Sequence, residues 1–152
     1  MKKFLLGFCL FAVSYLSQGQ TKSLNYQAVI MDPKPIEIPG TPITGQPYKN
    51  GKVNVRFTLL SKSGSVDYEE FHQATTDDFG LINLAIGSGF LGSASGISNQ
   101  STTATYRTFD AIKWDSNVKQ LRVDLSFDNG KSFSMASIQP FNYMAYALYA
   151  ES

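Results

Sequence analysis

The chain has 152 residues, of which 43% are hydrophobic and 13% aromatic, and its formal net charge is +1 at pH 7. This length is typical of one ordinary domain with a sizeable core. So small a net charge provides no basic field that would attract nucleic acid or an anionic membrane surface. Cys9 is the only cysteine, which excludes a disulfide framework within the chain.

The first 19 residues have the order of a secretory signal peptide. Two lysines are followed by an apolar run to about Leu16, and then by small or polar residues. The run is shorter than the ~20 residues of a spanning helix, which disfavours the alternative of a retained membrane anchor. We therefore expect cleavage after Gly19, export to the extracellular space or outer cell surface, and no membrane insertion of residues 20–152.

Alternation of apolar and polar residues dominates the remainder and indicates half-buried strands. The predicted strands lie within SLNYQAVI, KVNVRFTLLS, VDYEEFHQAT, GLINLAIG, QLRVDLSF and SFSMASIQ. The third alternates poorly, with Tyr68, Glu70 and His72 opposite Glu69, Phe71 and Gln73. In the last strand Phe133 and Met135 form the expected apolar face.

Turn signals separate the predicted strands. Asn129-Gly130 is a strong hairpin signal because both positions tolerate positive φ. SKSGSV predicts a turn around Gly64, and TTDDFG predicts another, in which aspartate side chains bond their own backbone. About six or seven strands in one domain predict an all-β fold, an antiparallel β-sandwich of the immunoglobulin-like or transthyretin-like kind.

Two long segments interrupt this rhythm within a single domain of residues 20–152. Residues 32–51 hold most of the prolines, so we expect an extended, semi-rigid loop there. Residues 87–108 are rich in Gly, Ser and Thr, which predicts a second long loop. Loops of this length are usually either functional or disordered, and the sequence leaves both open.

Candidates for chemistry are few. His72 is the only histidine, and Glu70, two residues earlier, is the carboxylate that could orient it as a general base. A surface or edge histidine is the favoured interpretation. Asp77 and Asp78 suit a turn better than a calcium site, because adjacent carboxylates point apart. We therefore expect no enzyme activity, no metal and no cofactor.

Trp114, the only tryptophan, lies in FDAIKWD. It could stack on a sugar ring in a carbohydrate-binding module. Its apolar neighbours Phe109 and Ile112 favour a role in the core or in anchoring a loop.

The stretch FNYMAYALYAES is unusually apolar for a soluble chain. Phe141, Met144, Ala145 and Leu148 are spaced as one helical stripe, and Pro140 suits a helix start, so we predict a short C-terminal helix over 141–150. The segment either completes the core or presents an assembly surface. The candidate interaction residues are Phe141, Tyr143, Met144, Tyr146, Leu148, Tyr149 and Trp114.

Four short motifs occur in order: LNYQAVIMD, GLINLAIGSG, FDAIKW and AYALYA. Together they resemble the N-terminal β-domain of secreted and surface proteins from Bacteroidetes-type bacteria, which opens on Asn-Tyr-Gln-Ala-Val and closes on Tyr-Ala-Leu-Tyr-Ala. The resemblance covers almost all of residues 20–152. Ala145 stands where the family usually has proline, and the two long loops look longer than usual.

In that family the closing motif often leads into a collagen-like or tail-fibre-like stalk. The resemblance implies the head or base module of an extracellular fibre or adhesin, and brings no catalytic residues with it. We therefore predict a structural or adhesive function. The expected partner is protein, either a second copy in a homo-oligomer or another surface or fibre component. The alternative is a carbohydrate- or peptide-binding module that uses Trp114 and the 87–108 loop.

Overall fold

The computed structural model describes residues 23–34, 36–38, 41–43, 45–92, 103–114 and 118–141. The predicted signal peptide, the centre of the 87–108 loop and residues 142–152 lie outside this described part.

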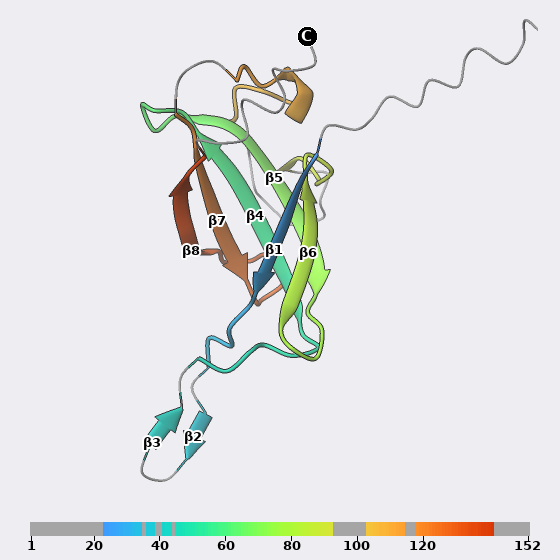
Figure 1. The fold of residues 1–152 in the computed structure, drawn as a ribbon, viewed down its shortest axis with the longest axis vertical. Coiled ribbons are helices and arrows are strands. Elements are labelled where there is room, and N and C mark those ends of the chain that lie inside the picture. The colour runs from blue at the N-terminus through green and yellow to red at the C-terminus, as the bar shows by residue number, and fades with distance from the viewer. Residues whose placement is uncertain are drawn as a thin grey trace, which may run out of the picture.

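The described chain is nearly all β-structure, which confirms the predicted all-β class (Figure 1). Its strands are β1 (Leu24–Val29), β2 (Ile36–Ile38), β3 (Thr41–Ile43), β4 (Lys52–Leu60), β5 (Val66–Thr75), β6 (Leu81–Ile86), β7 (Gln120–Ser126) and β8 (Ser134–Pro140). A short 3₁₀ turn, η2, spans Phe109–Ala111. The predicted C-terminal helix falls on residues outside the described part. Within the described part, no helix is long and apolar enough to cross a membrane.

All strand pairs in the described residues are antiparallel, and they form separate sheets. The largest has the order β5-β4-β7-β8, β1 pairs with β6, and β2 pairs with β3. In the largest sheet Val55 lies opposite His72 on one side and opposite Leu125 on the other. This register places the apolar face of β4 and β7 on one side of the sheet.

The core lies between this face and the β1–β6 pair. Alternate residues of β4, namely Val53, Val55, Phe57 and Leu59, are buried as the alternation predicts. Tyr26 of β1 packs its ring edge-on against Phe57, with 4.9 Å between ring centroids. The β1–β6 pair therefore covers β4. Other core residues are Ile30, Tyr68, Ile82, Ile86, Phe109, Ile112, Leu121 and Val123.

The predicted turns are confirmed, and each has the expected backbone chemistry. Asn129 and Gly130 have φ of 60° and 79°, and Gly64 has φ of 84°. Asp77 Oδ1 accepts the backbone N–H groups of Phe79 and Leu81, both at 2.8 Å. The short side chain of Asp77 therefore closes the β5–β6 turn, as the turn interpretation of this segment predicts.

The prediction of one long loop over residues 32–51 is wrong in part, because β2 and β3 pair within it. A proline in β3 does not prevent this, since every strand of a two-stranded ribbon has an open edge. The second long loop is also partly structured. Phe90 exchanges backbone hydrogen bonds with Phe71, at 2.8 and 2.9 Å, and Thr105 and Tyr106 donate to carbonyls of β5.

Two side-chain predictions are corrected. Met135 is 57% exposed, because the register of β8 turns it away from the core. His72 lies on an edge strand of the largest sheet, as one part of its prediction allowed, but it is not a surface residue: only 8% of it is exposed, since β5 turns it toward the core beside Phe57. Polar residues lie on both faces of β5, so alternation alone did not identify the face that turns toward the core.

Candidate functional site

Aromatic rings form a continuous contact chain where the chain leaves β8. Phe109 of η2 packs edge-on against Tyr68 at 5.7 Å and against Trp114 at 5.5 Å, measured between ring centroids. Trp114 contacts Phe141 at 5.9 Å with the rings tilted by 30°. We call Phe109, Trp114, Lys119 and Phe141 the exit cluster. It joins the core to the first residue of the 141–150 segment.

Lys119 holds the exit cluster from the strand side. Its carbonyl accepts the N–H of Phe141 at 2.7 Å, which continues the β7–β8 ladder by one residue. Its ammonium group lies 2.6 Å from Asp67 Oδ2, and both residues are buried. The Asp67 carbonyl also accepts the N–H of Tyr106 at 2.8 Å. The position of Phe141 is therefore fixed by backbone, ring and charge contacts together.

The structure brings two of the predicted interaction residues together, Trp114 and Phe141. The other predicted residues, Tyr143, Met144, Tyr146, Leu148 and Tyr149, lie outside the described part. Trp114 is half-buried, and its rings meet aromatic neighbours in two directions. Phe109 and Ile112, whose apolar character favoured an anchoring role for this tryptophan, are both buried.

A second cluster surrounds Glu70, whose side chain is fully buried on the core side of β5. The Tyr68 hydroxyl donates to Glu70 Oε2 at 2.9 Å, and His72 Nε2 lies 3.0 Å from Oε1. The N–H of Gly87 donates to both oxygens, at 2.9 and 3.0 Å, and the N–H of Gly89 donates to Oε2 at 2.9 Å. The carboxylate thus ties β5 to the loop after β6.

Glycines are required on the loop side of this cluster. Gly87 has φ of 104°, which is the region that favours glycine. A Cβ atom on Gly89 would lie 2.6 Å from His72 Nε2 and 2.9 Å from Glu70 Oε2. The AIGSG motif therefore brings two backbone donors close enough to satisfy a buried carboxylate.

The electrostatics of this cluster favour its structural role. Burial, and then the charge and hydrogen bond of Glu70, raise the pKa of Tyr68 well above that of an ordinary tyrosine. The tyrosine stays protonated and keeps donating. His72 has its Nε2 engaged by Glu70 and its ring against Phe57 at 5.4 Å. Sequence reasoning identified the neighbouring pair but missed that glycine N–H groups complete it; the signal was a charged residue between Tyr68 and His72 on one strand face.

A polar hollow of about 250 Å³ is lined by the first residues of β4 and the last residues of β5. These strand ends lie away from η2 (Figure 1). The lining of the hollow consists of three directly opposed residue pairs, Lys52 with Thr75, Val53 with Ala74 and Asn54 with Gln73, and of Asn129 in the β7–β8 turn. Asn54 is buried, and its Oδ1 has no hydrogen-bond partner. Sequence reasoning did not find this hollow, because it forms only where the start of β4, the end of β5 and the β7–β8 turn come together.

Among the described residues, no group of three or more His, Cys, Asp or Glu side chains is placed to hold a metal ion. A scan against protein-family models, a search of curated proteins and a search of solved structures each found no match.

Proposed function

We propose that this chain is a non-catalytic structural or adhesive domain, exported by its signal peptide, in which the 141–150 segment docks onto protein. The observation that carries the proposal is the exit cluster. Phe141 is held by Trp114, by the Lys119 carbonyl and, through Lys119, by Asp67. A segment that transmits load or fixes a neighbour needs such a rigid base.

We also propose a β-sandwich fold for this chain. The β1–β6 pair over the sheet of β4 is compatible with one β-sandwich domain, immunoglobulin-like or transthyretin-like, extending over residues 20–152. The helical stripe of the 141–150 segment remains a prediction from its sequence.

The surroundings of His72 support a non-enzymatic reading. A general base must reach the proton that it removes. His72 is buried, its Nε2 faces Glu70, and that carboxylate already accepts hydrogen bonds from Tyr68 and two glycine N–H groups. Such a pair holds a loop against a strand.

Light-scattering mass is the direct test. Residues 20–152 should form a dimer or larger oligomer, and a chain of residues 20–141 should be a folded monomer that keeps its exit cluster. A third chain, 20–139, removes Phe141 as well and shows whether the base itself is needed for folding. An unchanged mass for residues 20–152 and 20–141 would contradict the docking role.

Carbohydrate binding is the second candidate function, and the polar hollow is the observation that favours it. Amide and hydroxyl side chains such as Asn54, Gln73, Thr75 and Asn129 suit sugar hydroxyl groups. We therefore place sugar binding in this hollow first, and the predicted use of Trp114 and the 87–108 loop stays the alternative site. Glycan-array binding that is lost in Gln73→Ala but kept in Trp114→Phe would support it. Absence of binding to any glycan would leave the assembly function alone.

A further inference from the structure

The outer edge of β1 has no strand partner among the described residues. On its inner side, the Ile30 N–H donates to the Gly80 carbonyl at 2.8 Å, in register with the β1–β6 pairs. Backbone groups alternate in direction along an antiparallel ladder. Those of Tyr26 and Ala28 therefore face β6, whereas those of Asn25, Gln27 and Val29 face outward.

This edge lacks the usual protection against pairing. Exposed edge strands are commonly blunted by proline, charge or a bulge. The edge strand β8 of the largest sheet, for comparison, has Pro140 and a register shift beside Val123. β1 contains neither proline nor a charged residue, and its register with β6 is unbroken from Leu24 to Val29. It therefore presents a regular row of donors and acceptors.

The space beside β1 suits one added strand. Because Tyr26 packs on Phe57, β1 lies over β4, and β7 and β8 continue the larger sheet beyond it. Pairing of β1 with β1 of a second copy is less suitable than one added strand. It would bring the large sheets of both copies, which extend beyond β1, side by side into the same layer. Leu125 and Phe127 pack against the core and are only partly buried, so apolar side chains of an added strand could cover them further.

We propose that the outer edge of β1 receives residues 142–150 of a second copy as an added strand. This inference rests on the proposed function and names its docking surface. The sequence NYMAYALYA has no charge and no proline, so it can offer an unbroken row of N–H groups to an uncharged edge. Nine extended residues span about 30 Å, enough to cover the roughly 20 Å of β1.

Strand direction favours docking of the segment from a second copy over docking of the chain's own segment. β8 leads toward the end of the molecule where β1 begins (Figure 1). A segment returning from Phe141 along its own β1 would therefore run parallel to it. The segment of a second copy can run antiparallel, as every described pair does, and antiparallel pairing is slightly more stable. Docked on this edge the segment would be extended, whatever it forms alone.

Each copy then carries one donor segment and one acceptor edge. Such head-to-tail contacts build open chains unless their rotation closes a ring. This geometry matches a fibre-like assembly.

The test uses matched proline variants of residues 20–152 and sedimentation equilibrium. Gln27→Pro removes an outward N–H from β1, and Ile138→Pro makes the equivalent change at the β8 edge. We expect Gln27→Pro to weaken self-association by at least about tenfold and Ile138→Pro to leave it within about twofold. Equal association of wild type and Gln27→Pro would overturn the inference, while a monomeric 20–141 chain would still uphold the docking function.

A mixing experiment and an exchange measurement complete the test. Tyr146→Asp with Leu148→Asp should inactivate the donor, and mixing this chain with Gln27→Pro should give a complex with one copy of each. Absence of that complex overturns the inference. In the wild-type chain, hydrogen exchange at the Gln27 amide should slow on assembly while Ala28 stays protected throughout. If the exchange rate of the Gln27 amide does not change on assembly, the inference is also overturned. This measurement uses the wild-type chain, so it holds even if a variant fails to fold.

Discussion

At position 70 a carboxylate occupies the core face of a strand, a place that apolar side chains usually take. It is tolerated because donors surround it: Tyr68, His72, Gly87 and Gly89. Each buried donor or acceptor that loses its hydrogen-bond partner costs about 1–3 kcal/mol of stability.

Glu70→Gln should therefore lower the free energy of unfolding by about 2–4 kcal/mol, because an amide NH₂ would face the glycine N–H groups. Urea unfolding of residues 20–152 measures this. Glu69→Gln is the matched control, since Glu69 is the preceding residue on the opposite face and only half-buried, and it should cost less than about 1 kcal/mol. Equal losses in the two variants would show that the Glu70 cluster has no special role.

At the scale of elements, the β7–β8 turn owes its shape to one exposed carboxylate. Asp128 accepts hydrogen bonds from the Ser126 hydroxyl at 2.6 Å and from the N–H groups of Ser132 and Lys131 at 3.0 and 3.1 Å. These bonds, with Ser126 contributing most, hold the pKa of Asp128 well below that of an ordinary aspartate.

The lowered pKa of Asp128 makes the free energy of unfolding depend on pH. Below pH ~4 Asp128 takes up a proton in the unfolded chain but not in the folded chain. The stabilisation by the Asp128 hydrogen bonds is therefore fully present above that pH, and it is lost as the pH falls through the pKa of Asp128 in the folded chain. Carbon-detected titration of the Asp128 carboxyl should show a midpoint far below 3.8. Ser126→Ala should move it upward. A midpoint near that of an ordinary aspartate would mean that the turn does not form in solution as described.

The ion pair of Lys119 and Asp67 links the start of β7 to the start of β5. Removing one partner leaves a buried charge uncompensated, which typically lowers the free energy of unfolding by about 3–5 kcal/mol. Lys119→Met should therefore destabilise the chain strongly in urea unfolding. Lys119→Met combined with Asp67→Leu should recover most of the loss, because an apolar pair of similar volume is usually tolerated. A double variant no more stable than Lys119→Met would contradict this account.

The sequence predicted strands and turns well where local chemistry decides them. Alternation in β4 identified its buried face, and Asn129-Gly130 and Asp77 identified their turns. It failed where tertiary contacts decide. The buried face of β5 depends on glycine donors from beyond β6, and the β2–β3 pair forms within a proline-rich stretch that reads as a loop.

The candidate site was predictable in part for the same reason. Apolar neighbours of Trp114 in the sequence indicated its anchoring contacts. Its contact with Phe141 joins residues 27 positions apart, and the Lys119–Asp67 pair joins residues 52 positions apart. Neither leaves a local pattern. The open edge of β1 likewise becomes visible only when strand order is known.

At the scale of the whole molecule, Trp114 is a built-in reporter because it is the only tryptophan. Its emission should be blue-shifted relative to a solvated indole, since Phe109 and Phe141 cover part of its ring. We expect Phe141→Ala to shift the emission to the red and to increase quenching by acrylamide, with far-UV circular dichroism unchanged.

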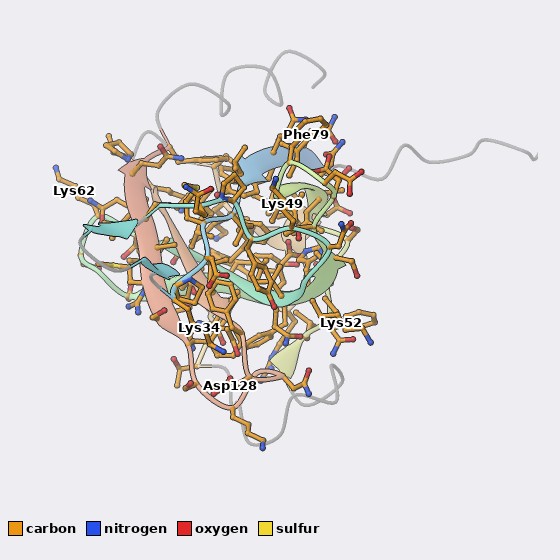
Figure 2. All side chains as sticks on the ribbon, turned by 90° about the horizontal axis from the view of Figure 1, so that it is seen from below. Lys34, Lys49, Lys52, Lys62, Phe79 and Asp128 are labelled. Carbon is orange, nitrogen blue, oxygen red and sulfur yellow. The ribbon has the colours of Figure 1, made fainter. Side chains whose placement is uncertain are left out.

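Phe79→Ala is the control, because Phe79 is 76% exposed in the β5–β6 turn and is not part of the exit cluster (Figure 2). It should leave both emission and quenching as they are. If Phe141→Ala also left them unchanged, Trp114 would not be covered by the residue that begins the 141–150 segment. The segment would then lack a fixed base, and a half-exposed indole face would again be open to a sugar. A red shift that accompanies loss of the oligomer in the same variant would instead connect the exit cluster directly to assembly.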